Sequence, residues 1–341
     1  MKTFKINEKE IKLPMFFPDA TYGKVLAISN EDLRKTGING VVVNAYHFER
    51  KKILDELRKK GKNYRVHDYM NLKDFVIISD SGGFQVMSLI SKDSKLGKIT
   101  DKGAEFVDLE TGKKLLLSPE KCIQLQLAIG SDIVMCLDEC TKPDISLREQ
   151  EKSVIRTIKW AKRCKKEFSR LTNEIKENEN SKEFSNPHQK NLISENEKPL
   201  LFAIIQGGES KKLRKKCAQE LKKIGFDGYS FGGWPVRNGK LLNEILEYTA
   251  DLIPWNNVKY AMGIGKPGDI IKCRKMGYDF FDCVIPTRDA RHQRLYVFIK
   301  DPAKNKKNLI NSFKELNINK KNSKNEKISK IYTSNLIRAK Q

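Results

Sequence analysis

Residues 280–291 read FFDCVIPTRDAR, an apolar and aromatic run that carries one acid and ends at a proline followed by two arginines. Such a run predicts a buried strand. A carboxylate inside a strand is costly to desolvate, so we expect Asp282 near the strand end, facing a cavity. Arg288 and Arg291, just beyond, could hold phosphate. Taken alone, the segment is more simply explained as a core strand with a capping acid and solvated arginines. The remaining strands favour a functional site over this simpler explanation.

Seven further short apolar runs share this character, and amphipathic stretches separate most of them. The eight expected strands are Met15–Asp19, Val41–Tyr46, Phe75–Asp80, Ile133–Asp138, Leu200–Gln206, Gly228–Gly233, Lys259–Ile264 and Phe280–Ile285. The expected helices include Lys51–Lys60, Pro119–Ile129, Ser146–Leu171, Ser210–Ile224 and Leu241–Ile253. Strands alternating with helices predict an α/β fold with a parallel sheet, and eight similar units favour a closed (β/α)8 TIM barrel over a doubly wound sheet.

The barrel is expected to occupy residues 1–300 and to carry two insertions. Residues 98–118 contain two strand-like runs around a glycine turn, which predicts a β-hairpin inserted after the third strand. Residues 172–198 are almost entirely Asn, Glu, Lys and Ser, which predicts a polar flexible insertion. Residues 301–341 are rich in Lys and Asn with short apolar patches. One patch is expected to form the eighth helix, and the rest a basic tail that either touches nucleic acid or is simply solvated.

Charge is the most unusual feature of the composition. The 341 residues include 66 Lys and Arg against 43 Asp and Glu, a formal net charge of +23. Such an excess suggests a polyanionic partner, nucleic acid before membrane. A genome rich in A and T encodes Lys and Asn often, and this accounts for part of the surplus of basic residues.

The sequence also predicts where the protein works. It has no run of 18 apolar residues and no signal-peptide core after Met1, so no membrane association is expected. Its seven cysteines are odd in number and scattered, which fits reduced thiols in the cytoplasm. No CxxC or CxC pair occurs, so cysteine spacing predicts no zinc site.

Polar or backbone-exposing residues stand at the same end of seven predicted strands. They are Asn44, Asp80, Asp138, Gln206, Gly232–Gly233, Met262–Gly263 and Asp282. The carboxyl ends of barrel strands meet on one face, where barrel enzymes place their active sites. Any one of these acids could merely cap a helix. The whole set predicts a polar ligand site holding three carboxylates.

Two of these strand ends suit a flat ligand. The sequence DSGGFQ at 80–85 places an acid before two glycines that permit close backbone approach, and then Phe84, which could stack on a ring. Gln206 precedes two glycines, so an amide and bare backbone could read the edge of a base. Each motif alone is also compatible with a turn and a helix cap.

Several motifs together resemble those of the tRNA-guanine transglycosylases. They are NAYH at 44–47, DSGGFQ at 80–85, LDECT at 137–141, QGG at 206–208, MGIGKP at 262–267 and the segment 281–291. The match runs in order from about residue 13 to residue 298. It implies exchange of the wobble guanine of tRNA for a 7-deazaguanine base, without cutting the RNA. The base is 7-aminomethyl-7-deazaguanine in bacteria and queuine in eukaryotes.

The resemblance also implies residue roles. Asp282 matches the nucleophile of a covalent aspartyl–ribosyl intermediate, and Asp80 matches the general acid/base, as expected for exchange at a ribose carbon with retention. The remaining substrate-binding residues are expected to be Asp138, Gln206, Gly233, Phe84, Met262, Ser81, Cys140 and Asn44. Asp138, Gln206 and the Gly233 backbone would read the purine edge, between Phe84 and Met262. The residues expected to grip the RNA backbone are Lys266, Arg288 and Arg291.

The chain departs from the family pattern at several places, among them Asp289 and His292–Gln293, which replace the family's usual Asn and Asn-Gly. Members usually carry a CxCxxC…His zinc site after the last strand, but here no cysteine follows Cys283 and His292 is the last histidine. We therefore expect no zinc and no other cofactor. The loop after the sixth strand reads GGWPVRN at 232–238, which leaves the identity of the incoming base open.

The expected partners are tRNA and a 7-deazaguanine base, and a homodimer is possible because family members usually dimerise. Two alternatives remain. One is a paralogue that acts on DNA or inserts a different base. The other is a non-catalytic tRNA-binding accessory subunit. The three strand-end acids argue against the latter, since a binding module needs no nucleophile.

Overall fold

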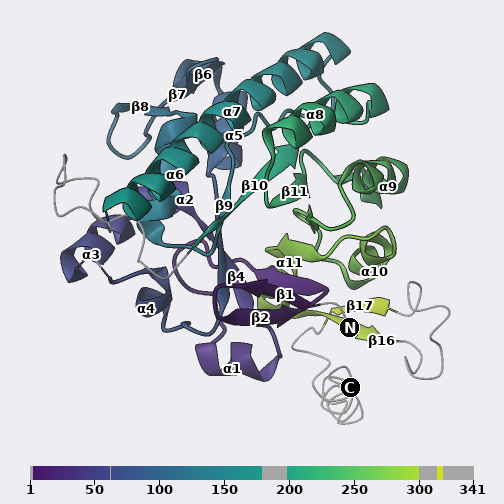
Figure 1. Cartoon of the computed structure of the whole chain (residues 1–341). Helices are drawn as coiled ribbons and strands as arrows, with labels where there is room; N and C mark the ends of the chain where they lie inside the picture. The colour runs from purple at the N-terminus through teal and green to yellow at the C-terminus, as the bar shows by residue number, and fades with distance from the viewer. Residues whose placement is uncertain (1–2, 62, 179–197, 299–312, 318–341) are drawn as a thin grey trace.

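The computed structural model describes residues 3–61, 63–178, 198–298 and 313–317 (Figure 1). Its centre is an eight-stranded parallel sheet in the order β3-β15-β14-β11-β10-β9-β5-β4. The strands are β3 (Met15–Pro18), β4 (Gly40–Asn44), β5 (Val76–Asp80), β9 (Ile133–Met135), β10 (Leu200–Ile205), β11 (Gly228–Phe231), β14 (Val258–Ala261) and β15 (Phe280–Cys283). All eight predicted strands are therefore confirmed.

The two edges of this sheet meet, which curls it into a barrel. Beyond β3, Asp19 forms an isolated parallel bridge with Val42 of β4. The Ala20 N–H also donates to the Val42 carbonyl at 2.7 Å. On the other side, β3 pairs in parallel with β15, so the first barrel strand joins the last. This closure confirms the predicted TIM-like barrel over the doubly wound sheet.

Helices surround the strands (Figure 1). The main ones are α2 (Ala45–Arg50), α3 (Ile53–Lys60), α5 (Gly83–Lys92), α6 (Pro119–Ile129), α7 (Leu147–Asn178), α8 (Lys211–Ile224), α9 (Asn243–Leu252), α10 (Pro267–Lys275) and α11 (Ile285–Arg291). The short helices α1 (Asn30–Lys35) and α4 (Val66–Met70) lie between early strands. Local sequence fixes the bounds of α6: the Ser118 hydroxyl accepts from the Lys121 N–H, and Gly130 ends the helix at φ 75°. No described helix is long and apolar enough to cross a membrane.

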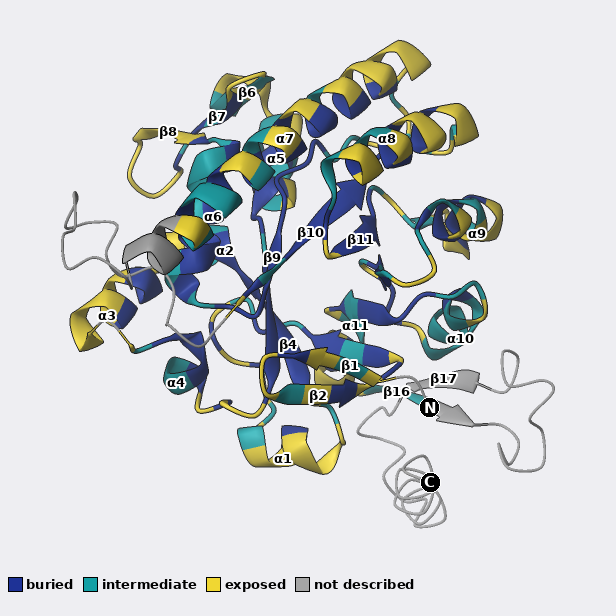
Figure 2. Cartoon of the chain, in the orientation of Figure 1, coloured by how far each residue is buried: buried dark blue, intermediate teal, exposed yellow. Residues whose placement is uncertain are grey.

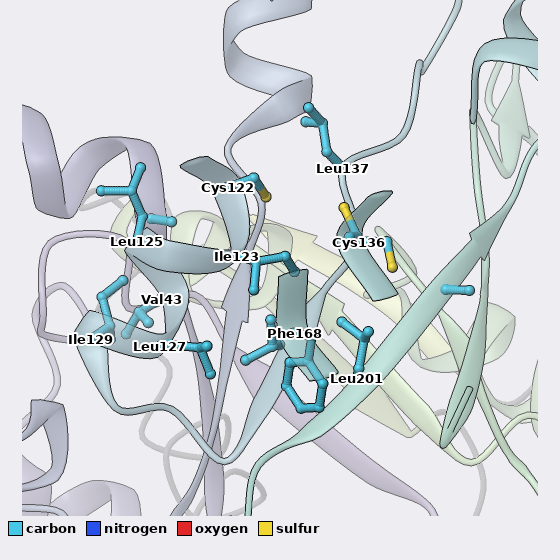
Figure 3. Packing of buried hydrophobic residues seen from close by; sticks show 14 of the residues in the cluster. Val43, Cys122, Ile123, Leu125, Leu127, Ile129, Cys136, Leu137, Phe168 and Leu201 are labelled. Atoms are coloured by element: carbon cyan, nitrogen blue, oxygen red, sulfur yellow. The ribbon is translucent and has the colours of Figure 1, made fainter. Parts of the chain in front are cut away.

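The strands are buried on both faces, as Figure 2 shows for the centre of the barrel. Inside the barrel, Phe17, Phe202 and Phe280 belong to one cluster of fully buried residues. Outside it, α6 and α7 cover the strands. Figure 3 shows Ile123 and Leu127 of α6 in the same cluster as Phe168 of α7. This double burial explains why the strands are continuous apolar runs rather than alternating ones.

The N-terminal hairpin covers the bottom of the barrel. It consists of β1 (Thr3–Ile6) and β2 (Lys9–Lys12), and the Phe4 ring meets that of Phe280 edge-on with centroids 5.3 Å apart. Here Asp132, which directly precedes β9, accepts from Lys9 Nζ at 2.6 Å and lies 2.9 Å from His67 Nε2. The candidate site lies at the opposite end of the barrel, at the C-terminal ends of the strands.

The predicted additions to the barrel are partly described. Residues 97–117 form a three-stranded antiparallel sheet of β6 (Gly97–Thr100), β7 (Gly103–Val107) and β8 (Lys114–Leu117). Two small antiparallel pairs are β12 (Val236–Arg237) with β13 (Lys240–Leu241), and β16 (Arg294–Phe298) with β17 (Phe313–Asn317). Helix α7 runs into the polar stretch as far as Asn178. The rest of the insertion predicted at 172–198, and most of 301–341 with its expected eighth helix and basic tail, lie outside the described residues.

Candidate active site

A cavity of about 620 Å³ opens at the C-terminal ends of the barrel strands. It brings together most of the residues singled out from the sequence: Asn44, Asp80, Ser81, Phe84, Asp138, Cys140, Gly233, Met262, Lys266, Asp282 and Arg288. Gln206 does not line the cavity but is buried beside it and binds Asp138. Arg291 is exposed on the last turn of α11 and is not part of the lining. The strand-end pattern therefore assembles at one site.

Asp282 is held by neighbours that all bind one of its two oxygens. The Tyr260 hydroxyl donates to Oδ1 at 2.8 Å, and the Gly263 N–H donates to the same oxygen at 3.1 Å. Desolvation in the cavity wall raises the pKa of Asp282 to about 6, although both hydrogen bonds oppose this shift. Part of the rise comes from the negative charges of Asp80 and Asp19.

Asp80 ends β5 and is oriented by the neighbouring strand. Asn44 Nδ2 donates to Asp80 Oδ2 at 2.9 Å, and Asn44 Oδ1 accepts from the His47 N–H at the start of α2. Both the nitrogen and the oxygen of the Asn44 side-chain amide are thereby hydrogen-bonded, which fixes its orientation. Desolvation raises the pKa of Asp80 to about 6 against hydrogen bonds from the Ser81 and Gly82 backbone. The carboxyl group is therefore able to give and take a proton near neutral pH.

Asp138 is buried three residues beyond the end of β9. Gln206 Nε2 donates to its Oδ2 at 2.5 Å. Burial raises the pKa of Asp138 to about 7, and the charges of Asp80 and Glu139 add to the rise. No arginine or lysine pairs with this carboxylate in the part of the chain that the structure describes. Acidic groups gathered in a cleft with no cation paired to them are typical of functional sites.

Aromatic side chains form the mouth of the cavity. The Phe84 and Trp234 side chains are exposed by 45% and 44%, and their rings meet edge-on with centroids 5.8 Å apart. The Trp234 indole N–H donates to the Thr141 carbonyl at 3.2 Å, which ties the loop after β11 to the loop after β9. Met262 also lines the cavity. A flat ring could enter between these apolar groups.

Three groups that the structure places here have no role predicted from the sequence. They are the Tyr260 hydroxyl, the Gly263 N–H and the Asp19 carboxylate. Asp19 was predictable, because it ends the first expected strand just as Asp80 ends the third. The contact between Tyr260 and Asp282 was not, because it depends on how β14 and β15 are placed side by side.

The side chains do not fit the zinc site that the fold family implies. Past Cys283 the sequence offers no cysteine, and His292 is its last histidine. In the four described ranges, no three His, Cys, Asp or Glu side chains come together as metal ligands.

Together these features define a barrel of the enzyme type, with carboxylates, a backbone donor and aromatic side chains around a cavity at its strand ends. The family model for queuine tRNA-ribosyltransferase matches residues 1–333. The chain is 38% identical over 292 residues to a queuine tRNA-ribosyltransferase of Mannheimia succiniciproducens, covering 85% of this chain and 69% of that protein. For the Haemophilus influenzae Rd protein of that name the identity is 38% over 288 residues, covering 84% and 67%. For that of Shewanella frigidimarina it is 39% over 287 residues, covering 84% and 68%.

The chain belongs to the queuine tRNA-ribosyltransferase family. It is accordingly a pentosyltransferase of tRNA modification, which confirms the class expected from its motifs.

Proposed function

We propose that this enzyme exchanges the wobble guanine of tRNA for a 7-deazaguanine base through a covalent intermediate on Asp282. The observation that carries the proposal is the one-sided hydrogen bonding of this carboxylate. Tyr260 and Gly263 both bind Oδ1, whereas Oδ2 accepts no hydrogen bond from the described residues. Oδ2 is then the oxygen that faces the ribose, and the two donors hold the group in place.

In the first displacement, Oδ2 forms a bond to the anomeric carbon of ribose while the bond to guanine breaks. The leaving base takes the electron pair, and Asp80 supplies its proton. In the second, the incoming base attacks the same carbon, the ester bond breaks, and Asp80 accepts the proton that the base gives up. A carboxyl group with a pKa of about 6 is suited to both transfers.

The purine edge would be read by the buried pair of Asp138 and Gln206 and by the Gly233 backbone. Phe84 and Met262 would cover the two faces of the ring, which offsets the cost of taking a base out of its stack. Ser81 and Cys140 line the same cavity. Lys266 and Arg288, at the mouth, would bind phosphates beside the exchanged nucleotide, and the exposed Arg291 would bind one further out.

The test is uptake of labelled guanine into polymer. The enzyme is incubated with the label and either bulk tRNA or duplex DNA, and uptake into tRNA alone is expected. Label in DNA would instead support the DNA-acting alternative. Competition by 7-aminomethyl-7-deazaguanine and by queuine would then identify the incoming base, which the GGWPVRN loop leaves open. A denaturation-resistant adduct between protein and tRNA would report the covalent step.

We also propose that the chain works without zinc. Metal analysis of the purified protein is expected to find no stoichiometric zinc, because the region after Cys283 lacks the thiolates that such a site needs. One zinc per chain would contradict this and would direct attention to His47, His67 and the barrel cysteines. A homodimer stays a prediction, to be tested by sedimentation.

A further inference from the structure

Arg214 is a cation buried directly behind the wall of the cavity. Its side chain lies on α8, is 1% exposed, and forms no ion pair with a carboxylate of the described residues. Burial lowers the pKa of this guanidinium to about 10, so it stays charged at neutral pH. A buried guanidinium is costly unless its N–H donors find hydrogen-bond acceptors. The acceptors of Arg214 show which parts of the site it holds.

The guanidinium joins two loops of the site through backbone carbonyls. Nη1 donates to the Ile205 carbonyl at 2.7 Å and Nε to the Gly208 carbonyl at 2.9 Å, both around the end of β10. Nη2 donates to the Gly232 carbonyl at 2.9 Å, just past the end of β11. The guanidinium carbon also lies 3.9 Å from the centroid of the Phe231 ring, which lines the cavity.

The bond to Gly232 fixes the direction of one peptide group. In a trans peptide the carbonyl and the N–H point in opposite directions. With the Gly232 carbonyl turned back to Arg214, the Gly233 N–H must point the other way. Gly233 lines the cavity, as does Cys140. This N–H is therefore presented to the ligand as a donor.

The two glycines that flank this peptide do not themselves restrain it. Gly233 has φ 88°, a conformation that favours glycine, and a Cβ on Gly232 would lie 2.6 Å from Gln206 Nε2. Both positions therefore require glycine, and a glycine pair rotates more freely than any other. The charged donor of Arg214 provides the restraint that the glycines lack.

We infer that Arg214 is a positioning residue that locks the peptide between Gly232 and Gly233 with its N–H toward the cavity, so that the site selects purines with a carbonyl at the 6-position. A purine with an amine there would face the N–H donor to donor and leave both groups unpaired. This inference rests on the proposed function, since it assumes that a purine occupies the cavity.

The test compares guanine with 2,6-diaminopurine, which has an amine in place of the 6-carbonyl and no proton on N1. The N1 difference is the same for every variant, so it cancels when variants are compared. Inhibition constants of both are measured against uptake of labelled guanine into tRNA. The measured quantity is the inhibition constant of guanine divided by that of 2,6-diaminopurine. In Arg214→Met this ratio is expected to be about tenfold higher than in the wild type, because the peptide is free to turn. Arg214→Lys, which keeps the charge and part of the donors, should lie between.

The control is Leu221→Ala, which truncates an equally buried residue of the same helix away from the cavity lining. A structural loss alone weakens both purines alike, so this variant should keep the wild-type ratio. An unchanged ratio in folded Arg214→Met would overturn the inference. If that variant fails to fold, an unchanged ratio in Arg214→Lys would do so. Failure of the wild type to take up guanine would overturn the proposed function instead.

Discussion

Two buried aspartates at opposite ends of the barrel have opposite environments. Asp132 at the bottom and Asp138 near the top are 3% and 7% exposed. Burial raises the pKa of both, but hydrogen bonds and charges from His67 and Lys9 outweigh it at Asp132 and leave a lowered pKa. At Asp138 the Gln206 amide and a backbone hydrogen bond oppose burial, but no cation does, and the pKa rises to about 7. Burial alone therefore does not decide the direction in which the pKa of a buried acid moves; in this pair, the presence of a cation does.

The largest effect is expected at the cavity end. Asp282→Asn should lower base exchange by at least about a thousandfold, because a neutral amide cannot attack the ribose. Affinity for tRNA should persist, since the cavity shape and the phosphate contacts remain. Labelled-guanine uptake, trapping of the covalent adduct and a tRNA-binding titration would be run together. An adduct formed in undiminished yield would identify another residue as the nucleophile.

The matching change at the bottom should affect folding instead. Asp132→Asn is expected to destabilise the protein by roughly 3–5 kcal/mol at neutral pH, because it leaves Lys9 and His67 without their carboxylate. Exchange per folded molecule should stay at the wild-type level. Urea denaturation beside the uptake assay measures both quantities. Loss of exchange without loss of stability would show that the two ends of the barrel are not separable in this way.

The pH dependence of stability should have opposite signs at the two ends. The folded-state pKa of Asp132 lies below its ordinary value of 3.8, so its contribution exists above that pH and disappears as the pH falls. The pKa of Asp138 is raised from 3.8 to about 7, so folding is most favoured at low pH and loses stability as the pH rises between these values.

Asp138→Asn should therefore be more stable than the wild type at pH 8, by about 2–4 kcal/mol, but not at pH 4. The expected functional loss is in discrimination between purines, with tRNA affinity unchanged. Denaturation curves at the two pH values measure the effect. A variant less stable than the wild type at pH 8 would mean that the ionised Asp138 has a stabilising partner.

The smallest effect concerns cations. Lys9 at the bottom is bound to Asp132, whereas Arg288 at the cavity mouth is exposed and forms no ion pair with a described residue. Arg288→Ala should lower the salt dependence of tRNA binding by about one unit of log–log slope, because one phosphate contact releases its counterions. Lys9→Ala should leave the slope unchanged. Equal slopes for both variants would remove Arg288 from the phosphate contacts.

The sequence predicted the strands and the polar groups at their ends because both depend on local patterns. A strand buried on both faces is a continuous apolar run, and its last residue marks the catalytic face. The groups whose roles were not predicted make contacts between residues that are far apart in the sequence. Tyr260 reaches Asp282 only through the pairing of β14 with β15, and Arg214 reaches Gly232 only because α8 packs behind two strand ends. Lys9 likewise meets Asp132 only once the hairpin lies across the barrel.

The pairing of β3 with β15 has a consequence for how the chain folds. Met15 is placed opposite Phe280, so the ring closes between residues that leave the ribosome among the first and near the last of the barrel. Local βα units can form during synthesis, but this contact waits for almost the whole chain and has the largest loop to close. Barrel closure should therefore be a late step in folding. Until then, the apolar faces of Met15 and Phe17 need protection from other chains.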